Sequence, residues 1–307
     1  MNILQAIMIG IVQGLTEFIP ISSTAHLIFA SRLLGLYGDA ATPALRAEQT
    51  TATIAVIQLG TLFAVLVYFA PDIWAITRAF VIDHFGLVRR RQLPVESRAA
   101  DGTTVKRQLS LSDDARLGWL IVIGSLPIAI VGLLFKEQIE GTFTKNLWVI
   151  AMMMIAVALL LGLAEKVGKR ERALKDLTWR DALAVGGAQV LALIPGASRS
   201  GTTMMGGLFA GQTRETAARF SFLLSIPAIA ASGLLELNEA IEKLPDGSAG
   251  PLIVATVVSG VVGYASIWFL LRFLRTHSTG VFIGYRLVVG LAILALLILG
   301  KISPLAV

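Results

Sequence analysis

A polar segment near the start of the chain carries Glu17, the only acidic residue between Met1 and Leu36. The surrounding stretch is apolar, and an Asp at a membrane-helix centre costs about 2.5–3.5 kcal/mol on the milder scales, so this carboxylate should line a polar cavity. Gln13 lies four residues earlier, on the same helical face. One carboxylate and one amide oxygen suit a hard cation such as Mg²⁺ or Ca²⁺. The alternative is a solvated Glu17 at the membrane interface.

Hydroxyl groups and an imidazole follow Pro20. Ser22, Ser23 and Thr24 are ordinary helix-capping residues, and capping is the alternative to any chemical role. The same geometry can bind phosphate, because helix N-termini are anion sites, and a hydroxyl beside a base can be a nucleophile. His26 comes three residues after Ser23 and could act as a general base, general acid or phosphate ligand. The alternative is a histidine that only packs in the core.

A second polar segment contains Arg199, the only charged residue between Asp181 and Arg214. A guanidinium binds phosphate oxygens bidentately, and nearby glycines let the backbone approach an anion closely. The small and hydroxyl residues expected to share this role are Gly196, Ser198, Ser200, Gly201 and Thr202. The alternative is a structural ion pair between Arg199 and Glu17. Arg286 is interpreted as an interfacial anchor or a structural pairing, with anion binding as its alternative.

The elements that must position these residues are membrane helices. Of 307 residues, 55% are hydrophobic and only 15% are charged, against about 25% in an average soluble domain. The chain has no cysteine, which excludes a disulfide scaffold and a zinc–thiolate site, and its composition excludes a disordered chain. Six stretches are apolar enough to be membrane-spanning helices: residues 54–70, 118–135, 146–164, 220–235, 250–271 and 280–300. The stretch at 220–235 is the shortest and is expected to extend back into 216–219.

Charged loops orient these six spans. Residues 86–117 contain seven Lys or Arg, and residues 165–181 contain six. The positive-inside rule places both loops in the cytoplasm, together with Arg272 and Arg275. The acidic loop at 236–249 then falls outside. All six spans agree with this one orientation.

Two apolar stretches, residues 1–36 and 182–213, are broken by proline, glycine and polar residues. Non-helical backbone at membrane depth must be buried by protein or line a wet cavity, so both are expected to be re-entrant helix–turn–helix segments. Ile19–Ser23 aligns with Ile194–Ser198 at an offset of 175 residues, and three spans follow each break. An odd number of crossings inverts the second half, which predicts an inverted-topology repeat.

The expected fold is therefore all-α and without strands. It is a polytopic membrane protein with six transmembrane helices and two re-entrant segments. A single domain covers residues 1–307, with one repeat at about 1–164 and the other at about 182–303.

Two motifs resemble the undecaprenyl pyrophosphate phosphatase family, the bacitracin-resistance type of integral membrane enzyme. They are Gln13–His26, with the sequence QGLTEFIPISSTAH, and Pro195–Gly201, with the sequence PGASRSG. The supporting stretches are Ile57–Gly60, Gly124–Pro127, Phe220–Pro227 and Tyr285–Arg286. The resemblance runs along nearly the whole chain, although the basic loop at 86–117 is longer than expected for the family.

The resemblance implies hydrolysis of undecaprenyl (C55) diphosphate to undecaprenyl phosphate and inorganic phosphate, which recycles the lipid carrier of peptidoglycan synthesis. It implies a divalent cation, Mg²⁺ or Ca²⁺, and a bacterial plasma-membrane protein whose active site faces outward. Ser23, His26 and Arg199 match family positions tied to catalysis or phosphate binding. Where the family has Glu or Gln, this chain has Gln13, so Glu17 is the main candidate for metal ligand or general base.

The mechanistic hypothesis is that Arg199 and the two breaks hold the diphosphate while Glu17 holds the cation. Either Ser23 or a water attacks the terminal phosphorus, and His26 or Glu17 takes the proton. The main alternative function is a transporter or flippase of an anionic polyprenyl lipid, because broken helices in inverted repeats are a transporter architecture. A third is a lipid phosphatase with a histidine nucleophile, which needs more than His26 alone. The expected partners are the lipid substrate and membrane lipids, without nucleic acid, and a homodimer is compatible with the sequence.

Overall fold

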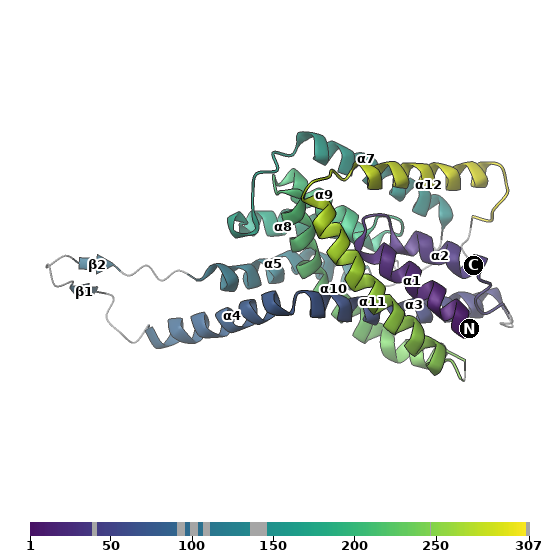
Figure 1. Ribbon diagram of the computed structural model, residues 1–307, viewed down its shortest axis with the longest axis horizontal. Helices are drawn as coiled ribbons and strands as arrows, with labels where there is room; N and C mark the ends of the chain where they lie inside the picture. Colours follow the sequence, from purple (N-terminus) through teal and green to yellow (C-terminus); the bar gives the residue numbers. More distant parts are fainter. Residues whose placement is uncertain are drawn as a thin grey trace.

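The computed structural model of the chain describes residues 1–38, 42–90, 96–98, 104–106, 111–135, 146–245 and 247–304. Helices dominate these residues, which confirms the all-α fold class (Figure 1). In the first half they are α1 (Ile3–Phe18), α2 (Ser23–Leu33), α3 (Pro43–Tyr68), α4 (Ala70–Arg90), α5 (Asp113–Leu134) and α7 (Leu147–Val167). In the second half they are α8 (Trp179–Val190), α9 (Arg199–Phe209), α10 (Arg214–Lys243), α11 (Ala249–Leu274) and α12 (Gly280–Ile298).

Six of these helices are long and apolar enough to cross a membrane, which confirms the predicted number of spans. They cover Glu48–Tyr68, Asp113–Leu134, Leu147–Val167, Arg214–Gly233, Ala249–Leu274 and Gly280–Ile298. The span at 54–70 begins earlier than predicted, at Glu48, because helix continues into a turn that contains charged residues. The span at 220–235 extends back through 216–219, as expected, and begins at Arg214. Apolarity locates the part of a helix that lies in lipid, and caps decide where the helix itself begins.

Three parts of the prediction were wrong in detail. The expected outer loop at 236–249 is helical as far as Lys243, because Glu, Ala and Leu favour helix beyond the apolar span. Residues 70–90 form the additional helix α4, which is too polar to read as a span. Within the basic loop, β1 (Glu96–Arg98) and β2 (Thr104–Lys106) pair as an antiparallel ribbon, whereas no strand was expected. Residues 91–95, 99–103 and 107–110 of that loop, among them Arg91 and Arg107, lie outside the described residues.

The first break is the turn between α1 and α2, and the second is the segment between α8 and α9. The two breaks end in the same way. Ser22 (φ 78°) caps α2 and Ser198 (φ 70°) caps α9, and each side chain accepts a hydrogen bond from the amide three residues later. These caps lie 176 residues apart, one more than the predicted offset of 175, because the second break has one more residue between its proline and its cap. Gly196 (φ 89°) lies in this longer turn. The matching caps make the breaks local equivalents, and the inverted membrane topology stays a prediction.

Close backbone contacts hold both broken hairpins in the bundle. Helix α1 packs on α11, and α8 packs on α5. A β-carbon at Gly14 would lie 2.7 Å from the β-carbon of Val262, and one at Gly186 would lie 2.2 Å from the carbonyl oxygen of Gly124. Glycine therefore sets the approach of these helices, as small residues do between membrane helices. This packing brings the ends of α1 and α8 toward the middle of the molecule (Figure 1).

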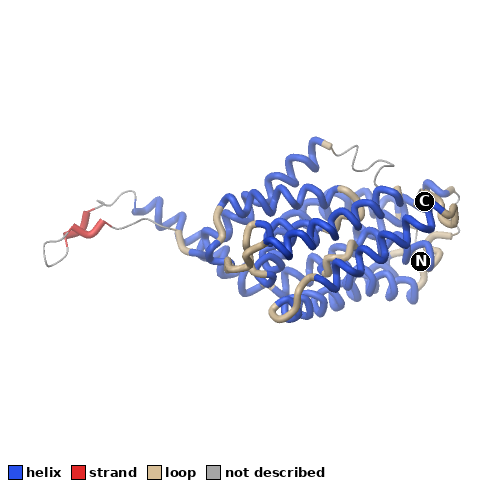
Figure 2. The backbone as a smooth tube through the Cα atoms, turned by 90° about the horizontal axis from the view of Figure 1, so that it is seen from above, coloured by secondary structure: helices blue, strands red, loops and turns tan. Residues whose placement is uncertain are grey.

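The two predicted cytoplasmic loops lie at the same end of the molecule. Arg116, at the end of the 86–117 loop, donates to the carbonyl of Lys175 in the 165–181 loop. Figures 1 and 2 show α4 and the ribbon projecting from one end, while both chain termini lie at the other.

Asp181 closes the turn that leads into α8. It accepts hydrogen bonds from Arg172 (2.5 Å) and from the backbone and side chain of Thr178 (both 2.7 Å). Burial alone would raise the pKa of the Asp181 carboxyl, but these hydrogen bonds outweigh burial and hold that pKa below its ordinary value. Asp181 is therefore an ionised structural group that fixes the start of α8.

Candidate active site

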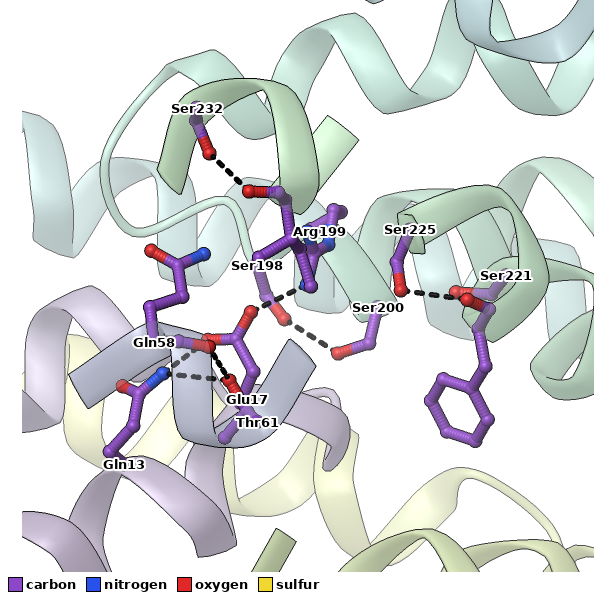
Figure 3. Close-up of polar contacts among 12 residues, drawn as sticks. Gln13, Glu17, Gln58, Thr61, Ser198, Arg199, Ser200, Ser221, Ser225 and Ser232 are labelled. Carbon is purple, nitrogen blue, oxygen red and sulfur yellow. Dashed lines mark hydrogen bonds and ion pairs between the residues drawn. The ribbon is translucent and has the colours of Figure 1, made fainter. Parts of the chain in front are cut away.

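Glu17 and Arg199, which are 182 residues apart in sequence, meet where α1 ends and α9 begins (Figure 3). A terminal nitrogen of Arg199 donates to Oε1 of Glu17 over 2.5 Å, and the two side chains are only 15% and 6% exposed. The burial excludes the alternative of a solvated Glu17. The structural ion pair weighed from the sequence is present.

Helix α1 holds the other oxygen of Glu17 through Gln13, and α3 contacts Gln13 in turn. The amide nitrogen of Gln13 donates to Oε2 of Glu17 (3.2 Å), as the four-residue spacing predicts, and also to Oγ1 of Thr61 (3.4 Å). Thr61 in turn donates to the carbonyl of Gln58 (2.7 Å). Figure 3 shows the side chains of these four residues gathered beside Arg199. Thr61 was missed by sequence reasoning, whose only signal here was the supporting stretch Ile57–Gly60.

The start of α2 separates its three hydroxyl residues by environment. Ser22 is 1% exposed, and its hydroxyl caps the helix. Ser23 is half-buried, and its hydroxyl makes no hydrogen bond within the part of the chain that the structure describes. Thr24 is exposed. The capping role considered from the sequence therefore belongs to Ser22, and Ser23 is the hydroxyl left available for other partners.

His26 is held by both of its ring nitrogens. Nδ1 lies 2.6 Å from the carbonyl oxygen of Ser22, and Nε2 lies 2.6 Å from the hydroxyl oxygen of Tyr285 on α12. The spacing of His26 and Ser23 suggested a shared face, but in the described structure no hydrogen bond joins these two residues. The tyrosine partner was missed, because nothing in the sequence predicts that α12 packs beside α2.

The second break presents an ordered set of hydroxyls. Oγ of Ser198 accepts a hydrogen bond from the amide of Gly201 (3.2 Å) and shares another with Oγ of Ser200 (3.2 Å). Thr202 is fully buried, and its hydroxyl donates to the carbonyl of Arg199 (3.0 Å), so this predicted binding residue faces its own helix. A β-carbon at Gly196 would lie 2.3 Å from the carbonyl oxygen of Ile150, which accounts for glycine there.

Arg286 ties the two breaks together. It is fully buried, and its guanidinium donates to Pro20 in the first break (3.4 Å) and to Gly196 and Ala197 in the second (both 3.0 Å). It also donates to the carbonyls of Met153 and Met154 on α7 (3.3 and 3.2 Å). Among the described residues no carboxylate pairs with it. Arg286 therefore has a structural pairing, as one interpretation of the sequence held, and its partners are backbone carbonyls. Its interpretation as an interfacial anchor was wrong, because the side chain is buried.

The donor atoms at this junction bear on whether it can hold a divalent cation. No cluster of three His, Cys, Asp or Glu side chains exists among the described residues. However, Oε1 of Gln13 is buried without a hydrogen-bond partner, beside the carboxylate of Glu17. Magnesium is commonly held by one or two carboxylates plus substrate phosphates. Gln13 and Glu17 therefore fit a cation whose remaining ligands come from the substrate and water.

Known proteins match this chain along its length. Residues 6–292 match the family described as Bacitracin resistance protein BacA. A protein of Syntrophobacter fumaroxidans named undecaprenyl-diphosphatase is 49% identical over 96% of this chain and 97% of its own length. Proteins of the same name from Chlorobaculum tepidum and Nocardia farcinica are 44% and 45% identical, each over 99% of this chain and 100% and 98% of their own lengths.

Proposed function

This chain belongs to the bacitracin resistance protein BacA family and hydrolyses undecaprenyl diphosphate, and we propose that the junction of Glu17 and Arg199 is where it does so. The products are undecaprenyl phosphate and inorganic phosphate. The hydrolase name of the relatives gives no support to the transporter alternative. The observation that carries the site assignment is the buried ion pair between the two breaks.

We propose that the diphosphate binds where the first turns of α2 and α9 meet. Both helix N-termini direct backbone amides toward the breaks, and helix N-termini favour anions. Arg286 adds a positive charge behind the two turns, and its hydrogen bonds are all used by backbone carbonyls. Arg199 is then the guanidinium that can turn toward a phosphate, because within the described structure its side-chain partner is the single carboxylate of Glu17.

Substrate binding would exchange the partners of Arg199. A diphosphate competes with Glu17 for the guanidinium, and Arg binds phosphate and carboxylate with the same bidentate geometry. The released Glu17 carboxylate, together with Oε1 of Gln13, becomes available to a cation. When bound, Mg²⁺ or Ca²⁺ would neutralise charge that develops on the phosphoryl oxygens. In the absence of substrate, the ion pair keeps both buried charges satisfied.

The attacking oxygen is that of Ser23 or of a water. Ser23 begins α2, and its hydroxyl is not engaged within the described structure. His26 is the nearby base, and its Nδ1 is bound to Ser22. Intact-protein mass spectrometry of a rapidly quenched reaction distinguishes the two routes, because a serine nucleophile leaves a phosphoryl group on the wild type that Ser23→Ala lacks. Water attack leaves no such species.

The multi-pass membrane location follows from the six apolar helices. We propose that the membrane is the bacterial plasma membrane, that the two broken hairpins are re-entrant, and that the site opens to the outer face. The supporting observation is the charge distribution, since both basic loops lie at the end opposite the termini.

The experiment that tests this function measures phosphate release from undecaprenyl diphosphate by the purified protein in detergent, where no transmembrane gradient exists. We expect release that EDTA abolishes and that Mg²⁺ or Ca²⁺ restores. Undiminished phosphate release in excess EDTA would contradict the proposal that Glu17 and Gln13 hold a cation.

A further inference from the structure

Tyr285 is hydrogen-bonded to His26, and the two rings are stacked. Its hydroxyl oxygen lies 2.6 Å from Nε2 of His26, and the two rings are nearly parallel, at 15°, with centroids 5.5 Å apart. The next residue on α12, Arg286, holds both breaks, so Tyr285 is fixed relative to the proposed site. A tyrosine hydroxyl can donate or accept a hydrogen bond, which makes it a suitable partner for a ring that changes protonation.

The contacts determine the tautomer of His26. A backbone carbonyl can only accept, so Nδ1, which lies 2.6 Å from the oxygen of Ser22, carries a hydrogen. In a neutral imidazole the other nitrogen is then an acceptor, and the hydroxyl of Tyr285 donates to Nε2. The basic lone pair of His26 is therefore covered by the tyrosine hydroxyl, and a proton that reaches Nε2 passes through that hydroxyl.

The pair also lies at the surface that faces the bilayer. Tyr285 is 42% exposed, and Val281 and Val288, on the same face of α12, are 59% and 68% exposed. A substrate whose chain lies in lipid can approach the first break from this side. Tyr285 is thus partly exposed, whereas Arg286 beside it is fully buried.

We propose that Tyr285 relays the proton of the attacking oxygen to His26, an inference that rests on the proposed function. As that oxygen bonds to the terminal phosphorus, the bond from phosphorus to the bridging oxygen breaks, and its electron pair leaves with undecaprenyl phosphate. The proton of the attacking hydroxyl passes to the tyrosine oxygen, and the proton of the tyrosine passes to Nε2. The imidazolium then donates from both nitrogens, to Ser22 and to Tyr285, until it releases one proton to solvent.

The kinetic test compares Tyr285→Phe, His26→Ala and the double variant in the detergent assay. Each single variant is expected to lower kcat about 100-fold with KM changed less than about threefold, and the double variant should be no slower than His26→Ala. Tyr264→Phe is the matched control, because Tyr264 is a similarly exposed (45%) tyrosine of the membrane span α11. A Tyr285→Phe enzyme with wild-type kcat, or two single effects that multiply, would overturn the relay.

A second measurement reads the tautomer itself. The chain has three histidines, so ¹⁵N spectra of imidazole-labelled protein can be assigned by substituting His84 and His277. Wild type should show His26 with hydrogen on Nδ1, and Tyr285→Phe should show a mixture of tautomers. An unchanged tautomer in Tyr285→Phe contradicts the proposal. Loss of activity in Glu17→Gln alongside a normal Tyr285→Phe enzyme leaves the proposed function standing and removes only this relay.

Discussion

At the residue scale, the proposed chemistry depends on few polar side chains in an apolar environment. Glu17, His26 and Arg199 could be selected from the sequence because charged and titratable residues are rare in its apolar stretches. Thr61 and Tyr285 could not, because Thr and Tyr are ordinary residues of membrane helices. Their roles follow from the packing of α3 on α1 and of α12 beside α2, which one sequence does not show.

Gln13→Glu tests the cation site at this scale. The amide nitrogen of Gln13 lies 3.2 Å from a carboxylate oxygen of Glu17, so the substitution replaces a hydrogen bond by two adjacent like charges. We expect the variant to melt at a lower temperature than wild type in EDTA and to gain more stability from added Mg²⁺. The measurement is thermal unfolding against Mg²⁺ concentration, without substrate. Equal Mg²⁺ dependence in both proteins contradicts this ligand assignment.

At the element scale, two features of the breaks decide how the site is built. The serine caps at 22 and 198 direct two helix N-termini inward, and glycine contacts let α1 and α8 approach their neighbours. The breaks were predictable from proline and glycine in apolar sequence. The offset was wrong by one residue because sequence similarity aligned the prolines, whereas the fold aligns the caps. Helix α4 was not predicted because it is too polar to be recognised as a membrane span.

Adjacent glycines on α8 test the close contact. A β-carbon at Gly186 would lie 2.2 Å from the carbonyl oxygen of Gly124, while nothing lies within 4 Å of one at Gly187. Gly186→Ala should therefore destabilise the protein by about 1–3 kcal/mol, through overpacking. Gly187→Ala should be neutral or stabilising by up to about 1 kcal/mol, because alanine is the better helix former. Equal thermal midpoints for the two variants would be inconsistent with this packing.

Arg286→Met tests the link between the breaks. Methionine is similar in length but has no donor, and each buried acceptor left without a partner costs about 1–3 kcal/mol. Since the guanidinium serves five carbonyls, we expect a loss of several kcal/mol in stability, with partial recovery in Arg286→Lys. Unfolding in detergent measures both. A Met variant as stable as wild type would show that the guanidinium does not hold the breaks.

At the scale of the whole molecule, the described parts of the two basic loops lie at one end. The two basic loops meet there through Arg116 and Lys175, and the chain termini lie at the opposite end. The count of six spans and their order along the chain were predictable from hydropathy, because a bilayer fixes the length of an apolar helix. The tertiary pairing of the two halves around a common junction was only suggested by the repeated motif.

Single cysteines test the orientation, because the chain has none of its own. Glu171, between the end of α7 and the start of α8, and Ser303, after α12, are both exposed. A membrane-impermeant thiol reagent should label Ser303→Cys from outside the cell and label Glu171→Cys only after permeabilisation. Labelling of both positions from the same side would overturn the proposed topology.

The central claim is that the two breaks form one active site through Glu17 and Arg199. The most direct measurement is phosphate release from undecaprenyl diphosphate in detergent by Glu17→Gln and Arg199→Gln, with circular dichroism to show that both variants keep their helices. Loss of a transition-state charge contact predicts kcat/KM lower by about 100-fold or more in each variant. Wild-type release by either folded variant would contradict the account.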